Sequence, residues 1–227
     1  FDAQVGDLGR LIPQTAGELR ADGWVRWYDG RLDGSMTGQG RNLAVDGMRI
    51  AAANLTARLG EGKGYPLHVT ASLRKVVYEE FQAESVTLEA DGTALRHTVN
   101  AVLHSAGAEA RIALSGAYSP RSWQGEIVRF SGRDRVGPWS LAAPAKLTIA
   151  AGRITLAPLV VTGATPERIE IAGELSGEPL SGSIRAAWNG MNLARVNPWL
   201  TEVRVTGASA GNVQLRLAAG ERPAFSG

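Results

Sequence analysis

The 227-residue chain lacks cysteine, so it can form neither a disulfide nor a thiolate metal site. Aromatic residues make up only 6% of the chain and charged residues 20%, which is too apolar for a disordered chain and too charged for a membrane-spanning one. Long apolar runs are also missing, because Thr155 and Pro158 interrupt the most apolar stretch, residues 154–161. These absences leave a globular chain that is long enough to bury a core.

Residues suited to catalysis or nucleic-acid binding are scarce. The formal net charge is only +2, and acidic Glu79–Glu80 soon follows the densest basic pair, Arg74–Lys75. Of the three histidines, His97 and His104 flank one predicted strand and lie over about 20 Å apart if it is extended, so they cannot share a metal ion. All three, with His68, lie in strand-like or turn-flanking positions that are typical of surface histidines. We therefore expect no enzyme activity, no metal, no cofactor and no nucleic-acid partner.

Apolar and polar residues alternate with period two through most of the chain. In a β-strand this spacing sends apolar side chains to one face and polar side chains to the other. The polar positions are mostly Arg, Glu, Thr and Gln, which suit a solvated face, so the pattern predicts antiparallel sheets with one wet side. The clearest alternating stretches are residues 86–90, 110–114, 145–149, 153–156, 168–171 and 213–217.

Six Asp-Gly or Asn-Gly dipeptides are spaced like the turns of β-hairpins. Such dipeptides readily adopt the positive φ angles that tight two-residue turns require. Together with the alternation they predict a meander of about a dozen short strands. The six dipeptides are Asp22-Gly23, Asp29-Gly30, Asp33-Gly34, Asp46-Gly47, Asp91-Gly92 and Asn189-Gly190.

Two short segments carry the only helical signal. Residues Asp7 to Ile12 and Asn192 to Val196 each begin with a capping Asx residue and end shortly before a proline. The two segments also resemble each other, since Asp7-Leu8-Gly9-Arg10 aligns with Asn192-Leu193-Ala194-Arg195. We interpret residues 1–227 as a single β-rich segment with a boundary between structural repeats near residues 190–200.

The order of motifs between residues 123 and 200 resembles the TamB family of bacterial envelope proteins, close kin of the AsmA-like and YdbH-type bridge proteins. The shared pattern is a Trp-x-Gly strand, a Trp-x-Leu strand with a proline, paired strands and then a short helix. One departure is the absence of the cysteine that the family often carries in the strand corresponding to Leu159–Thr162. The segments that carry the resemblance are 123–127, 137–141, 143–147, 153–159, 168–175, 192–193 and 197–200.

The resemblance implies a long, taco-shaped antiparallel sheet with an apolar groove, in a periplasmic protein that is anchored in the inner membrane and reaches the outer membrane. Because Phe1 is neither an initiator methionine nor the start of a signal peptide, we expect the chain to be a segment of that longer protein. Such proteins are implicated in phospholipid transport between the two membranes. TamB also pairs with the Omp85-type partner TamA and supports autotransporter secretion, so unfolded outer-membrane protein strands are a further possible client.

The alternation itself favours a lipid groove. A curved sheet whose apolar face no helix covers must bury that face on itself or on a ligand. The alternative is a closed β-sandwich or barrel that binds protein or carbohydrate, with its apolar faces packed together; a β-helical enzyme fits less well because the strand spacing is irregular. The predicted groove residues, which bind acyl chains and require no cofactor, are Leu88, Leu103, Leu114, Ile127, Leu141, Ile149, Leu156, Ile171 and Ile184.

Overall fold

The computed structural model describes residues 1–10, 12–28, 31–60, 66–164, 166–177, 180–200, 202–218 and 224–226. The chain divides into two compact units, residues 1–109 and 110–227. Both consist almost entirely of antiparallel β-strands. The prediction of an all-β, antiparallel fold with very little helix is therefore confirmed.

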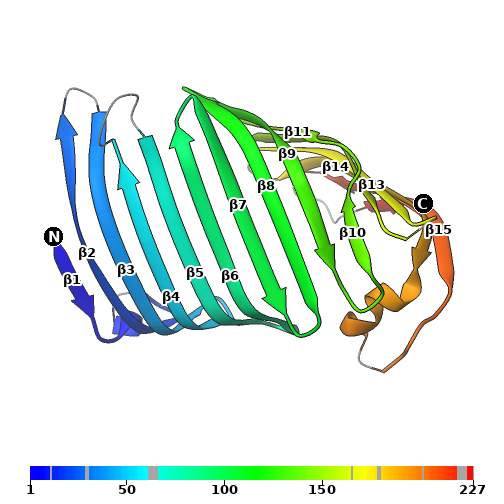
Figure 1. Ribbon diagram of the computed structural model, residues 1–227, viewed down its shortest axis with the longest axis horizontal. Coiled ribbons are helices and arrows are strands. Elements are labelled where there is room, and N and C mark those ends of the chain that lie inside the picture. Colours follow the sequence, from blue (N-terminus) through cyan, green and yellow to red (C-terminus); the bar gives the residue numbers. More distant parts are fainter. Residues whose placement is uncertain are drawn as a thin grey trace. The chain divides into compact units, whose positions relative to one another are not determined.

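The first unit is a meander in which each strand pairs with the next along the chain. Figure 1 shows β2 to β7 lying side by side in one layer. Most of these strands are 10 to 15 residues long, so they are longer than the short strands expected from the sequence. The strands are β1 (Asp2–Val5), β2 (Thr15–Tyr28), β3 (Arg31–Val45), β4 (Met48–Leu59), β5 (Pro66–Tyr78), β6 (Phe81–Thr93) and β7 (Arg96–Ser105).

The second unit keeps the same meander with one interruption. Strand β9 pairs with both β10 and β11, and β12 pairs with the same two strands, so β10 and β11 bridge different stretches of β9 and β12. The strands are β8 (Ala108–Ser119), β9 (Ser122–Arg133), β10 (Pro138–Leu141), β11 (Ala145–Ala150), β12 (Arg153–Thr162), β13 (Arg168–Ser176), β14 (Ser181–Asn192), β15 (Ala208–Leu217) and β16 (Ala224–Ser226). Sixteen strands are described in the two units, more than the dozen expected.

Both predicted helical segments are short 3-10 helices. Helix η1 spans Leu8–Arg10 and helix η2 spans Leu193–Trp199. The capping geometry is the same in both, because Asp7 Oδ1 accepts the Gly9 N–H at 3.0 Å and Asn192 Oδ1 accepts the Ala194 N–H at 3.0 Å. The local likeness of the two segments is thus structural, whereas the longer repeat with a boundary near residues 190–200 stays a prediction.

Of the five predicted hairpin turns within the described residues, one lies where the sequence placed it. Asp46 and Gly47 join β3 to β4 with φ angles of 46° and 80°. Asp29-Gly30 lies outside the described residues. The prediction was wrong for the other four dipeptides, which lie inside long strands whose ladders continue past them: Asp22-Gly23 in β2, Asp33-Gly34 in β3, Asp91-Gly92 in β6 and Asn189-Gly190 in β14.

A left-handed residue interrupts the alternation in two strands of the first unit. Asn42 in β3 and Lys75 in β5 have φ angles of 48° and 51°. In β5 the apolar residues on either side of this point, Leu73 and Val76, are three positions apart rather than two, yet they pack in the same cluster. The left-handed residue therefore returns the following apolar side chain to the same face.

Candidate functional site

One face of the first unit is apolar along the strands. The register aligns Leu55, Ala71, Leu88 and Ala101 across β4 to β7, and the adjacent row on that face aligns Leu73, Val86 and Leu103. Paired residues in antiparallel strands share a face, so these rows lie on one side of the sheet. A small cluster formed by Ile50, Val76 and Ala83 is buried against the second row.

The second unit has an apolar face of the same kind. The register aligns Leu147, Leu156, Gly173, Ile184 and Leu215 across β11 to β15. Beyond an irregularity between Leu156 and Leu159, a parallel row continues on this face with Leu159, Ile171, Ala186 and Val213. The intervening residues, such as Thr155 opposite Glu174, point to the other face.

The nine predicted groove residues divide between these two apolar faces. Leu88 and Leu103 lie on the face of the first unit. The other seven belong to the second unit, where Leu114, Ile127, Leu141 and Leu156 share one packed cluster, while register places Ile149, Ile171 and Ile184 on its face. The expected parity is therefore present within each unit, and a role in lipid binding stays a prediction.

These faces are only partly shielded from solvent. Within the second unit Ile127 is 7% exposed, but Ile149 on the same face is 44% exposed. Within each unit the described strands are hydrogen-bonded into one continuous sheet. An apolar face in this state can still accept an apolar ligand.

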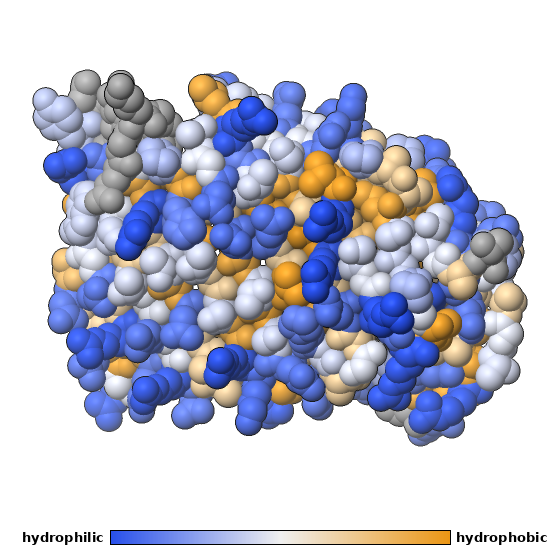
Figure 2. All heavy atoms as spheres, viewed as in Figure 1, coloured by the Kyte–Doolittle hydropathy of each residue, from blue (hydrophilic) through white to orange (hydrophobic). Residues whose placement is uncertain are grey.

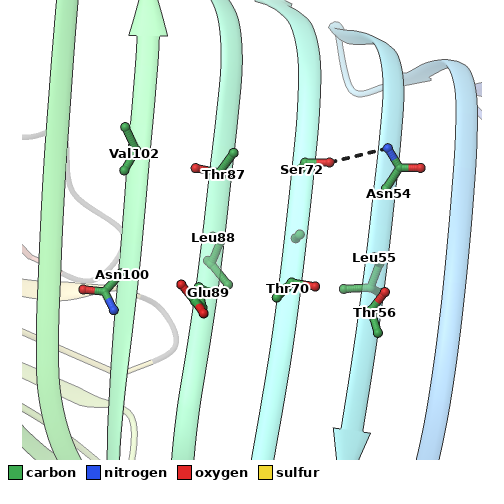
Figure 3. A pocket seen from close by; sticks show the side chains of 11 residues that line it. Asn54, Leu55, Thr56, Thr70, Ser72, Thr87, Leu88, Glu89, Asn100 and Val102 are labelled. Atoms are coloured by element: carbon green, nitrogen blue, oxygen red, sulfur yellow. Dashed lines mark hydrogen bonds between the residues drawn. The ribbon is translucent and has the colours of Figure 1, made fainter.

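The hollow that the structure outlines in the first unit lies over the opposite, polar face. Figure 3 shows two rows of side chains on β4 to β7, one formed by Asn54, Ser72, Thr87 and Val102 and the other by Thr56, Thr70, Glu89 and Asn100. Hydrophilic and intermediate residues also predominate over these strands in Figure 2, which has the viewing direction of Figure 1. Hydroxyl, amide and carboxylate groups suit water or a polar ligand. Leu55, Ala71 and the predicted groove residue Leu88 also line the hollow.

The second unit contains an ion cluster that the sequence analysis did not find. Arg195 of η2 donates from Nη2 to Glu167 Oε2 at 2.7 Å and from Nε to Glu167 Oε1 at 3.0 Å, and it also binds Asp134 through Nη1. The side chains of Arg195 and Glu167 are only 11% and 9% exposed. Glu167 further accepts the backbone N–H groups of Ala164 and Asn192. The cluster thus attaches η2 to the loops that follow β9 and β12.

The hydrogen bonds from Arg195 lower the pKa of Glu167 below its ordinary value, against an opposing contribution from burial. Glu167 also raises the pKa of Arg195, which is ionised in any case. Every acceptor oxygen of Glu167 is already engaged by the chain. A cluster saturated in this way is suited to holding loops together rather than to chemistry.

The described residues do not assemble a catalytic or metal centre. Residues 207–211 form a Gly-x-Ser-x-Gly stretch, but Ser209 lies in strand β15, where its Oγ accepts the Trp188 Nε1–H at 3.1 Å. A nucleophile elbow needs a sharp strand-to-helix turn, whereas Ser209 lies within an extended strand. Among the described residues, no group of three or more His, Asp or Glu side chains could hold a metal ion, and no helix is long and apolar enough to cross a membrane.

Comparison with known proteins finds one family. The family model for the N-terminal domain of TamB matches residues 1–227, which is the whole chain. Neither the search of curated proteins nor the search of solved structures finds a match.

Proposed function

The chain belongs to the TamB family of envelope proteins, and from this premise we propose that its apolar sheet faces hold phospholipid acyl chains during transport between the inner and outer membranes. The observation that carries the proposal is the register, which aligns the apolar residues of successive strands on one face of each unit. Acyl chains lying across such a face would be bound through the burial of apolar surface rather than through specific polar contacts. This mode of binding agrees with the scarcity of catalytic motifs.

The expected binding energy is sufficient for a carrier. Each methylene group removed from water contributes about 0.8 kcal/mol, so half of a sixteen-carbon acyl chain contributes on the order of 6 kcal/mol. The exposed apolar side chains of the second unit, such as Ile149 and Ile154, would lose their contact with water at the same time. Such an affinity retains a lipid and still allows its release.

The proposed location is the periplasm, as part of a longer protein that is anchored in the inner membrane and reaches the outer membrane. The proposed protein partner is the Omp85-type protein TamA, bound through a region outside residues 1–227. Lipid delivery of this kind would support the assembly of outer-membrane proteins and the secretion of autotransporters. Unfolded outer-membrane strands are the competing client for the same apolar faces.

Site-specific photo-crosslinking in cells tests the proposal. A photoreactive residue at Leu156 or Ile171, on the apolar face, should capture phospholipid in the full-length protein. The same residue at Thr155 or Glu170, on the polar face of the same strands, should not. Equal capture on both faces would indicate nonspecific contact, and capture of protein strands instead of lipid on the apolar face would identify the other client.

The substitution Ile171→Arg tests transport directly. A guanidinium group on an apolar face costs several kcal/mol unless it is paired, so lipid transport by the full-length protein should stop. Because the face is partly open to water, this substitution should lower the free energy of unfolding less than a charge placed in a closed core would. Thr155→Arg, on the polar face beside Glu174, is the matched control and should transport normally. Severe unfolding by Ile171→Arg, with no lipid captured at either parity, would favour the closed sandwich instead.

A further inference from the structure

The end of strand β2 exposes large apolar side chains to an unusual degree. We call residues Trp24 to Tyr28 the aromatic tip. In this tip Trp24 is 39%, Val25 62%, Trp27 71% and Tyr28 75% exposed. Four of five consecutive residues are therefore large and apolar or aromatic, and all four are in contact with solvent.

The tip is apolar on both faces of the sheet, unlike the strands around it. Val25 and Trp27 share the parity of Leu19 and Ala21 and continue the apolar face of the first unit. Trp24 and Tyr28 point to the opposite face, where Trp24 is paired with Ser35. An acyl chain lying on the apolar face would cover only Val25 and Trp27, so a ligand of that kind leaves the other two aromatic rings unexplained.

The one described cation of the tip is neutralised within the sheet. Arg26 Nη2 lies 2.8 Å from Asp33 Oδ2 on the neighbouring strand, and its guanidinium carbon is 5.7 Å from the centre of the Trp24 ring. Internal pairing lowers the cost of bringing a charge into a less polar environment. The tip therefore combines exposed aromatic area with little free charge.

We propose that the aromatic tip inserts into the interfacial region of a phospholipid bilayer, so that the apolar face of the first unit ends at a membrane surface. Tryptophan and tyrosine prefer this region because each has an apolar ring and one polar hydrogen-bonding group. A bilayer interface surrounds a strand end on both faces, which matches the loss of alternation in the tip. The purpose of the contact, lipid entry at the edge of the apolar face, rests on the proposed function.

Vesicle flotation of the purified chain tests the insertion. Residues 1–227 should float with zwitterionic phosphatidylcholine vesicles, and 0.5 M salt should not release the protein because the Arg26 charge is already paired. The double variant Trp27→Ser, Tyr28→Ser should have a partition coefficient onto these vesicles that is lower by about tenfold or more. Tyr78→Ser, Phe81→Ser is the control, because it removes an aromatic pair that is 47% and 40% exposed from a hairpin at the opposite end of the strands, and it should float like the unmodified chain. Unchanged far-ultraviolet circular dichroism should show that both variants are folded.

Three results would overturn the inference. They are no flotation of the unmodified chain, equal loss of flotation in the two double variants, and binding that occurs only to anionic vesicles and disappears in salt. The variant Ile171→Arg separates this inference from the proposed function, because it should float normally. Flotation without lipid capture at Leu156 would contradict the proposed function alone, and lipid capture at Leu156 without flotation would contradict the membrane-inserting tip alone.

Discussion

At the scale of single residues, Arg195 shows how one nearly buried cation can organise several loops. Its acceptors lie 28 and 61 residues earlier in the chain, on Glu167 and Asp134. The aligned residue Arg10 ends the other Asx-capped 3-10 helix, but its side chain is largely exposed and its Nε lies 3.6 Å from Asp7 Oδ2. Two arginines in equivalent local motifs therefore differ completely in their tertiary environment.

Replacing Glu167 should destabilise the second unit measurably. Glu167→Gln removes the charge from the most buried ion pair while Asp134 remains, so we expect a loss of about 2 kcal/mol in the free energy of unfolding. Denaturant-induced unfolding measures the loss. Glu170→Gln breaks the exposed pair with Arg168 and should change the free energy of unfolding by less than about 0.5 kcal/mol. Similar losses in the two variants would contradict a special role for the Arg195 cluster.

The same pair predicts a dependence of stability on pH. The pKa of Glu167 is lower in the folded chain than its ordinary value of 4.5, so the folded state favours the carboxylate. This contribution is complete well above pH 4.5 and is lost as the pH falls through the lowered, folded-state pKa. The difference in unfolding free energy between the unmodified chain and Glu167→Gln should therefore be constant near neutral pH and shrink in acid. A difference that stayed constant down to pH 3 would contradict this assignment.

At the scale of elements, the strands of the first unit depart from strict alternation at Asn42 and Lys75. A non-glycine residue with positive φ is strained, because its Cβ approaches the backbone. Each strand compensates by returning its next apolar residue to the shared cluster around Ile50 and Val76. Tertiary packing therefore selects a backbone conformation that asparagine tolerates and that lysine does not favour on its own.

Substitutions at Lys75 should reveal this strain. Lys75→Gly should raise the free energy of unfolding by about 0.5–1 kcal/mol, because glycine adopts positive φ without a steric penalty. Lys75→Val should lower it by about 1–2 kcal/mol, because a β-branched residue is poorly tolerated there. Lys146→Val in β11, an exposed strand position without positive φ, is the control and should be neutral or slightly stabilising. Thermal unfolding monitored by circular dichroism distinguishes these outcomes, and a loss of stability in Lys75→Gly would refute the argument.

At the scale of the whole molecule, the described residues bury little of their apolar surface completely. Only seven apolar residues in the described part of the chain are buried, and three of them are the small residues Ala83, Ala90 and Ala145. Large apolar residues such as Leu88 and Ile149 remain more than a third exposed. A chain that buries so few apolar residues should gain stability when a ligand covers its apolar faces.

Lysophosphatidylcholine, kept below its micelle-forming concentration, should therefore raise the melting temperature. A ligand at a hundred times its dissociation constant stabilises by about 2.7 kcal/mol, which corresponds to a shift of roughly 5–10 °C for a domain of this size. Ile171→Arg should reduce the shift strongly, and Thr155→Arg should leave it unchanged. Equal shifts in the two variants would mean that the lipid binds elsewhere.

The sequence alone was sufficient to predict the all-β class, the two short helices and the face of apolar residues in the strands that alternate regularly. Alternation is a local property, so the parity of Leu156 against Thr155 and of Ile171 against Glu170 follows from the chain itself. The caps at Asp7 and Asn192 are local for the same reason, since each side chain bonds a backbone group two residues away.

Only the tertiary structure decided the turns, the ion cluster and the irregular strand positions. Asp22-Gly23 and Asp91-Gly92 can form hairpin turns, but neighbouring strands hydrogen-bond to both sides of them and keep them extended. Gly92 accommodates its place in β6 with a φ of 128° that few other residues could adopt. The partners of Arg195 come from distant loops, and no local pattern specifies which loops meet at the end of a sheet. Local periodicity determines which way a side chain points, whereas the ladder of neighbouring strands determines where each strand ends and what its loops contact.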